Sequence, residues 1–154
     1  MNRTRMTIST RKRGGGRDGI LATSPCDLDG PDEVRELVRR FYADVAQDDL
    51  LGPLFNDVAA VDWADHLPKL TRFWCRALLG IEGYQGNPFR AHAAINDRSP
   101  FTPAHFERWL QLFGDTLELG WVGPNTERAL ALARNVAAVH SSQLVGRPRA
   151  GAQP

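Results

Sequence analysis

Cysteine is scarce in this chain of 154 residues, which contains only Cys26 and Cys75. Two cysteines cannot form the network of disulfide bonds that stabilises small secreted domains, so we expect a reducing, cytoplasmic location. Long apolar runs are also missing, because no window approaches the ~18 uninterrupted apolar residues that a membrane-spanning helix requires. The apolar stretch 19–23 is too short for a secretory signal. We therefore expect a protein with no membrane partner.

The motifs of several large enzyme classes are absent as well. The sequence has no glycine-rich phosphate loop, no Cys-x-x-Cys pair, no His-Glu-x-x-His zinc motif and no nucleophile elbow. A ferritin-like di-iron site requires Glu-x-x-His motifs, and none of the four histidines has a carboxylate three residues before it. These absences exclude nucleotide hydrolysis, zinc peptidase chemistry and di-iron chemistry at the level of sequence.

Charge is balanced overall but unevenly distributed. The chain has 19 basic and 18 acidic residues, whereas residues 1–30 carry six basic and three acidic side chains. We interpret 1–30 as a disordered basic arm, 31–145 as one folded domain and 146–154 as a flexible tail. The arm is either a solvated tail or a segment that attracts nucleic acid or anionic lipid. It has no aromatic residue for stacking on bases, so we favour the solvated tail.

Apolar residues between 31 and 145 recur at the spacing of α-helices. Val34, Leu37, Val38 and Phe41 predict a helix over 31–46, with Pro31 in its first turn. Three further helices are expected to begin at Asp62, at Thr102 and at Pro124, the first of them ending at Gly80. A short segment is expected over 89–95, and no stretch alternates with the period of a strand. The predicted fold class is all-α.

Four histidines and several aromatic residues with polar tips are the candidates for chemistry. His66 lies within an apolar helical face, and His92 lies on the short segment between two loops. We expect His105 to be exposed in the first turn of its helix, and His140 to interact with the C-terminal end of the last helix. Tyr42 and Trp109 need hydrogen-bond partners if they are buried. Such groups around one apolar cavity would suit a flat ligand with a polar centre.

Several motifs occur in the order typical of one protein family. They are Phe41-Tyr42, Leu51-Gly-Pro-Leu-Phe55, Trp63-Ala-Asp-His66, Phe73-Trp74, Tyr84-Gln-Gly-Asn-Pro-Phe-Arg-Ala-His92 and His105-Phe-Glu-Arg-Trp109. Taken together, this series resembles the truncated haemoglobins, and specifically their third, or P-type, group. The resemblance covers residues 31–145. It implies a shortened globin in which two helices pack over two and enclose haem b.

The resemblance also implies roles for individual residues. His92 matches the proximal histidine that binds the iron, and it is the expected metal ligand. Tyr42 and Trp109 match the distal hydrogen-bond donors, and His66 matches the histidine of the distal helix. Phe55 matches the aromatic residue that packs on the macrocycle. The distal wall is expected to continue through Leu70, Phe73 and Trp74.

The leading hypothesis is a haem protein that binds oxygen or another diatomic gas. Two strong donors favour slow release, and hence chemistry or sensing over bulk oxygen transport. The alternative is a haem-dependent redox enzyme, either a nitric-oxide dioxygenase or a peroxidase-like enzyme, which needs an external reductase. A third possibility is a helical interaction module without haem whose basic arm binds nucleic acid, which we consider the weakest. The functions of the arm and the identity of the ligand are not implied by the resemblance.

Overall fold

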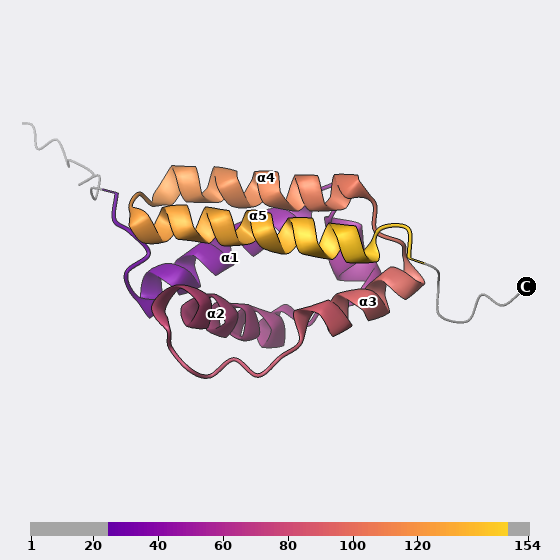
Figure 1. Ribbon diagram of the computed structural model, residues 1–154, viewed down its shortest axis with the longest axis horizontal. Helices are drawn as coiled ribbons and strands as arrows, with labels where there is room; N and C mark the ends of the chain where they lie inside the picture. Colours follow the sequence, from indigo (N-terminus) through magenta and orange to yellow (C-terminus); the bar gives the residue numbers. More distant parts are fainter. Residues whose placement is uncertain (1–24, 148–154) are drawn as a thin grey trace, which may run out of the picture.

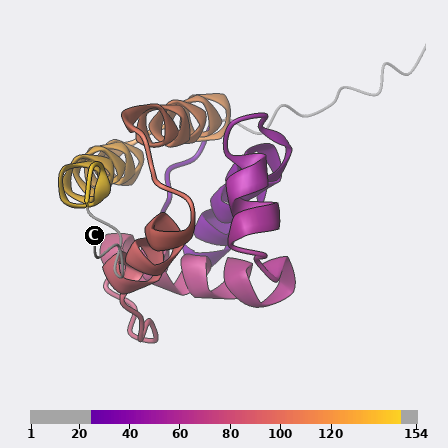
Figure 2. The same ribbon diagram turned by 90° about the vertical axis from the view of Figure 1, so that its right-hand side faces the viewer.

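A computed structural model describes residues 25–147 and places them in an all-helical arrangement, as predicted. Its elements are α1 (Pro31–Gln47), the π-helix η1 (Leu54–Val58), α2 (Trp63–Leu79), α3 (Pro88–Arg98), α4 (Pro103–Gly120) and α5 (Pro124–Leu144). α4 packs on α5, α1 packs on α2, and α1 also contacts α4. Figures 1 and 2 show α4 and α5 side by side, with α2 and α3 across from them. No helix within the described range is long and apolar enough to cross a bilayer.

The helices begin and end at residues that satisfy their terminal backbone groups. The side chain of Asp62 accepts a hydrogen bond from the N–H of Ala64 and caps α2, and Gly80 ends that helix with a left-handed φ of 67°. Asn87 caps α3 through the N–H of Arg90, and Pro88 follows at the first helical position. The predicted helix starts at 62, 102 and 124 are confirmed. The short segment expected over 89–95 is an 11-residue helix.

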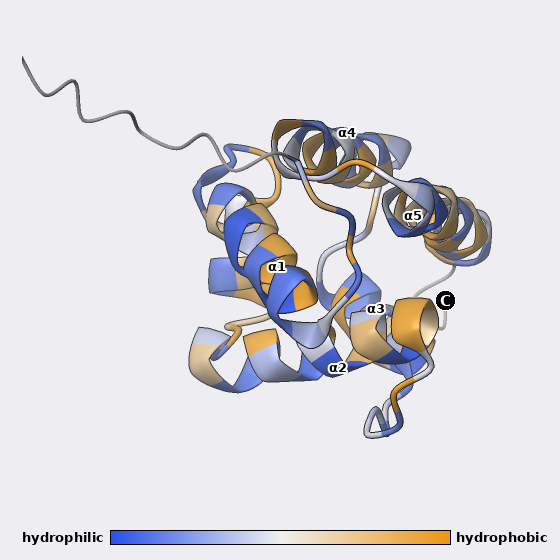
Figure 3. Ribbon diagram, turned by 90° about the vertical axis from the view of Figure 1, so that its left-hand side faces the viewer, coloured by the Kyte–Doolittle hydropathy of each residue, from blue (hydrophilic) through white to orange (hydrophobic). Residues whose placement is uncertain are grey.

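The core lies where α1, α2 and α4 meet, and its largest members are aromatic. Trp74 and Phe113 stack at 4.9 Å between ring centroids, and Phe41 meets Phe113 edge-on at 5.1 Å. All three side chains are almost completely buried. Figure 3 shows hydrophobic and hydrophilic residues on the same helices, as expected of helices that bury one face. Removing such a ring typically costs about 3–5 kcal/mol, so this cluster fixes how the helices pack.

Residues just before α1 also pack against the helices. Leu28 is fully buried, and the carboxylate of Asp27 accepts hydrogen bonds from the N–H groups of Asn125 and Thr126 at 2.9 and 2.8 Å. Asp27 thus caps α5 from a distant part of the chain, which its sequence position does not reveal. Gly123 makes room for it, because a Cβ at that glycine would lie 2.5 Å from Cγ of Asp27. Of the arm predicted over 1–30 and the tail predicted over 146–154, residues 1–24 and 148–154 lie outside the described residues.

Two buried polar side chains tie together elements that flank the pocket described below. Asn96 on α3 donates to the carbonyl of Leu144 at 3.2 Å and accepts from the N–H of Phe101 at 2.7 Å. Asp48, after α1, pairs with Nε of Arg108 on α4 at 2.6 Å. Because unpaired buried polar groups are costly, these bonds fix the positions of α3 and α4.

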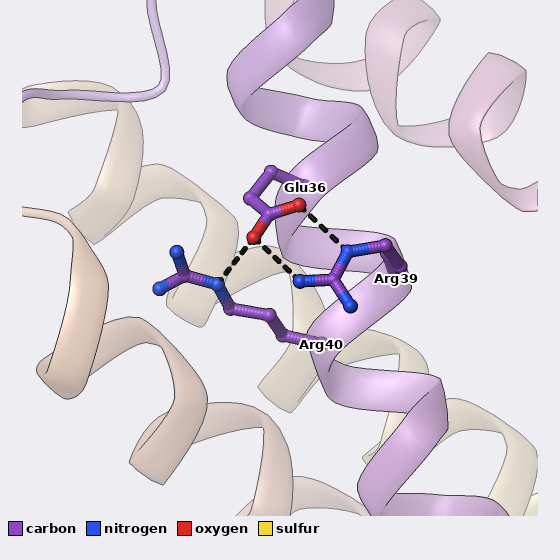
Figure 4. A network of polar contacts seen from close by, with 3 residues as sticks. All are labelled: Glu36, Arg39 and Arg40. Atoms are coloured by element: carbon purple, nitrogen blue, oxygen red, sulfur yellow. Dashed lines mark hydrogen bonds and ion pairs between the residues drawn. The ribbon is translucent and has the colours of Figure 1, made fainter.

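A smaller network lies on the outer face of α1. Glu36 accepts two hydrogen bonds from Arg39 and one from Arg40, as Figure 4 shows. The bonds from Arg39 and Arg40 lower the pKa of Glu36 to about 2. The guanidinium of Arg40 also lies 5.2 Å from the ring centre of Trp121, just after α4. Exposed ion pairs of this kind contribute little each, and this network mainly orients Arg40 over Trp121.

Candidate functional site

An apolar pocket lies among η1, α2, α3, α4 and α5 and holds about 840 Å³ of space not filled by atoms, including a part open to solvent. Most of its lining is aliphatic or aromatic. All four histidines of the chain, which stand far apart in the sequence, also line it: His66, His92, His105 and His140. The fold therefore gathers the sequence's scattered imidazoles around one apolar space.

His92 presents one ring nitrogen to this pocket. The cap at Asn87 and the following Pro88 start α3 so that His92 lies just beyond its first turn. Its Nδ1 is enclosed by protein and has no hydrogen-bond partner among the described residues, whereas Nε2 is not one of the buried unpaired atoms and the residue lines the pocket. Burial, together with the charge of His140 and of His66, lowers the pKa of His92 to about 4. The ring is therefore neutral at physiological pH, which is the form that binds a metal.

Tyr42 on α1 is close to Trp109 on α4, but within the described chain only Trp109 of the two is a pocket-lining residue. Tyr42 is buried on α1, with its ring 6.1 Å from that of Phe55 and 6.2 Å from that of His66. Burial raises the pKa of the Tyr42 phenol, and a hydrogen bond from the Trp109 side chain opposes that rise. Tyr42 therefore keeps its proton and remains a hydrogen-bond donor. Trp109 itself lines the pocket.

Phe55 and His66 form a neighbouring part of the lining. Phe55 stacks on Trp63 at 5.8 Å with ring planes 16° apart, and the indole N–H of Trp63 donates to Asn56 at 3.2 Å. Burial lowers the pKa of His66, as does the charge of Lys69, so its imidazole is also held toward the neutral form. Phe55, His66, His92 and Trp109 are thus brought together as residues of one pocket.

The remaining candidates for the distal wall lie behind the lining. Trp74 is buried against Phe113, and Phe73 meets the rings of Trp74 and Tyr84 edge-on at 5.4 and 5.3 Å. Leu70 packs against the same hydrophobic core. None of Leu70, Phe73 and Trp74 is among the pocket-lining residues of the described chain. A direct contact of these three with a cofactor stays a prediction.

Sequence reasoning did not place His105 and His140 in the site. His105 is half-buried rather than exposed, because its Nδ1 accepts the backbone N–H of Thr102 at 2.9 Å and the ring turns into the pocket. Nδ1 of His140 lies 2.8 Å from the carbonyl oxygen of Val136, one turn earlier in α5, and not at the C-terminal end of that helix as predicted. The signal for His140 was its position on the same helical face as Val136 and Ala137, which also line the pocket.

Comparison with known proteins agrees with this arrangement. A family model described as "Bacterial-like globin" matches residues 27–141. The Group 3 truncated hemoglobin ctb of Campylobacter jejuni is 35% identical over 91 residues, which are 57% of this chain and 69% of that protein. The chain belongs to the bacterial-like globins, as a group 3 truncated haemoglobin. The match begins at residue 27, so it includes the Asp27 that caps α5.

A solved structure resembles this globin closely. The crystal structure of group III truncated hemoglobin from Campylobacter jejuni superposes with a TM-score of 0.71 at 28% identity, and the match covers 80% of this chain and 97% of that one. The predicted truncated-globin fold is therefore confirmed. Membership in the family implies a haem cofactor and a diatomic ligand.

The pocket of this globin fits a haem on its own evidence. A flat apolar macrocycle with a central iron needs apolar walls and one accessible imidazole nitrogen. The lining is largely apolar, and Nε2 of His92 is open while its Nδ1 is enclosed. The imidazole donor and the apolar character of the lining thus suit an iron porphyrin.

Proposed function

We propose that this truncated haemoglobin binds oxygen or another diatomic gas at the iron of haem b, with His92 as the protein ligand of the metal. The observation that carries the proposal is the neutral His92 ring, whose Nε2 opens to an apolar pocket. Neither cysteine lines the pocket, which supports a haem held without covalent attachment. Haem iron supplies the binding of the gas, and the protein supplies the metal ligand, the hydrogen bonds and the exclusion of water.

Tyr42 and Trp109 are proposed to donate hydrogen bonds to the bound gas. Tyr42 accepts the hydrogen bond from Trp109 and keeps its own O–H as a donor, because burial holds the hydroxyl protonated. Trp109 lines the pocket, and its single N–H would turn from Tyr42 to the gas when the gas is bound. A hydrogen bond from a fixed donor to a group that gains negative charge contributes about 1.5–3 kcal/mol. Since 1.4 kcal/mol is a factor of ten, one such bond slows release by about one to two orders of magnitude. Slow release favours sensing or chemistry over bulk transport.

The His92 assignment is tested by changing the pocket histidines one at a time. In His92→Ala we expect the ferrous protein to lose the resonance Raman band of the iron–histidine bond, and added imidazole should restore a ligand. His66→Leu is the matched control, because His66 lines the same pocket but is proposed not to bind the iron. We expect this variant to keep the band.

Two results would overturn the assignment. One is a normal iron–histidine band in His92→Ala together with its loss in His66→Leu, which would exchange the roles of the two residues. The other is a wild-type protein that takes up no haem when the purified chain is titrated with it. In that case an absorption spectrum would show free haem only, and the pocket would serve a different apolar ligand.

A further inference from the structure

Two buried nitrogen atoms lack a hydrogen-bond partner among the described side chains, and they belong to adjacent rings. The atoms are Nδ1 of His92 on α3 and Nε2 of His140 on α5. The ring centroids lie 4.9 Å apart, with ring planes 74° apart. An unsatisfied buried polar atom destabilises the folded state, so two of them in adjacent rings require a physical reason.

The backbone of α5 determines which nitrogen of His140 carries the proton. Its Nδ1 lies 2.8 Å from the carbonyl oxygen of Val136, and a carbonyl can only accept a hydrogen bond. Nδ1 of His140 is therefore the protonated nitrogen of the neutral ring. It follows that Nε2 of His140 carries a lone pair and is an acceptor without a donor.

Binding of a metal to Nε2 of His92 would determine which nitrogen of this ring carries the proton, and would make the other nitrogen a donor. A neutral imidazole that coordinates through Nε2 carries its proton on Nδ1, which then needs an acceptor. In most sites that acceptor is a carbonyl, a carboxylate or a water molecule. No described group within hydrogen-bond distance serves His92 in this way. Its nearest ring neighbour is His140, which offers a free acceptor.

We propose that His140 is a positioning residue that accepts a hydrogen bond from Nδ1–H of His92. This inference rests on the proposed function of His92. Ring nitrogens joined by a hydrogen bond lie about 2.9 Å apart, which a centroid separation of 4.9 Å allows after a small rotation of the rings. The ring centroid of Phe101 lies 6.4 Å from that of His92, and the ring centroid of Phe89 lies 6.0 Å from that of His140. The bond would therefore form in an apolar setting.

The bond would act on the metal site in two ways. It would fix the orientation of the His92 ring, and it would increase the electron density that Nε2 donates to the metal. It would also join α3 to α5 through the site itself. His140 is not the metal ligand in this arrangement, because its Nε2 is enclosed by protein while Nε2 of His92 is open to the pocket.

The first test needs no haem. Long-range ¹H–¹⁵N NMR of the purified haem-free chain reports which nitrogen of each imidazole is protonated. We expect the tautomer of His140 with its proton on Nδ1. The tautomer with its proton on Nε2 would overturn the proposal, because that ring could not accept a bond from His92.

The second test compares His140→Leu and His140→Gln in the haem-loaded protein. Leucine removes the acceptor, whereas glutamine retains an acceptor oxygen. In His140→Leu we expect the iron–histidine Raman band to move to lower wavenumber and haem affinity to fall about 10–100-fold, as is typical when a partner of a metal-bound histidine is lost. His140→Gln should restore part of both values.

Each remaining outcome has a definite meaning. An unchanged band and unchanged affinity in His140→Leu would overturn the proposal and leave His92 as the ligand. Complete loss of the band in His140→Leu, with retention in His92→Ala, would show that His140 binds the iron and would overturn both proposals. If His140→Leu fails to fold by circular dichroism, the NMR tautomer and the His140→Gln values still decide the question.

Discussion

Replacing Asp27 with alanine tests whether the segment before α1 belongs to the fold. Asp27 accepts hydrogen bonds from the N–H groups of Asn125 and Thr126, and from the hydroxyl of Thr126 at 2.7 Å. It is the side chain that caps α5, because the position directly before that helix is Gly123, which has no side chain to do so. Asp27→Ala leaves these donors at the helix terminus without their carboxylate.

The expected loss follows from the kind of bonds that are removed. An ordinary capping residue contributes about 0.5–2 kcal/mol, and a negative charge at a helix N-terminus adds about 0.3–1 kcal/mol. The cap and the charge together predict a loss of about 1–3 kcal/mol in the free energy of unfolding. For a chain of this size, 1 kcal/mol corresponds to about 4 °C in melting temperature, so the expected decrease is about 4–12 °C.

The effect should depend on pH in a defined direction. Burial opposes ionisation of Asp27, but the hydrogen bonds from Asn125, Thr126 and Leu28 outweigh it and lower its pKa below the usual 3.8. A carboxyl group with a lowered pKa stabilises the fold above its unfolded-state pKa, and that contribution is lost as pH falls through the folded-state value. The difference between wild type and variant should be full at pH 7 and shrink below about pH 4.

The assay is thermal unfolding, monitored by far-ultraviolet circular dichroism at pH 7 and below about pH 4. Asp44→Ala is the matched control, since Asp44 is an exposed carboxylate on α1. An exposed substitution of this kind is expected to change stability by less than about 0.5 kcal/mol. Equal melting temperatures for Asp27→Ala and Asp44→Ala at pH 7 would refute the capping role of Asp27.

Two further predictions concern the pocket and its frame. Tyr42→Phe and Trp109→Phe should each raise the oxygen dissociation rate about ten- to hundred-fold with little change in association, as measured by stopped-flow; unchanged rates in both would contradict their proposed roles. Asn96→Ala leaves the carbonyl of Leu144 and the N–H of Phe101 unpaired. We expect a loss of about 1–3 kcal/mol in urea unfolding and faster haem loss to an acceptor globin, and wild-type values would contradict this.

The local features of the fold were predictable because their signals lie within a few residues of each other. Asp62 and Gly80 mark the ends of α2 by capping and by left-handed conformation, and both act on the nearest backbone groups. The periodicity of α1 likewise gave its bounds to within one residue. The segment predicted over 89–95 is shorter than α3, which spans Pro88–Arg98. Its cap at Asn87 and its polar last turn carry no apolar periodicity, so the sequence did not reveal them.

The features that depend on tertiary contacts could not be predicted in the same way. Asp27 caps a helix that begins 97 positions later, and no local pattern connects the two. His105 and His140 come to line the same pocket as His92 only through the packing of three helices. The resemblance to a family supplied His92, His66, Phe55 and Trp109 as pocket residues. The residues that hold these side chains in place were seen only in the structure.

The anchoring of α3 has a consequence for how the globin exchanges its cofactor. This 11-residue helix follows a non-helical segment over 80–87 and packs mainly on α5, with Asn96 as its buried polar tie. A short element with few partners opens at a lower free energy than the whole molecule. Haem would then enter and leave by sub-global opening of one wall while the aromatic core stays closed. The rate of haem exchange and the free energy of global unfolding could then be changed independently by substitutions in different parts of the chain.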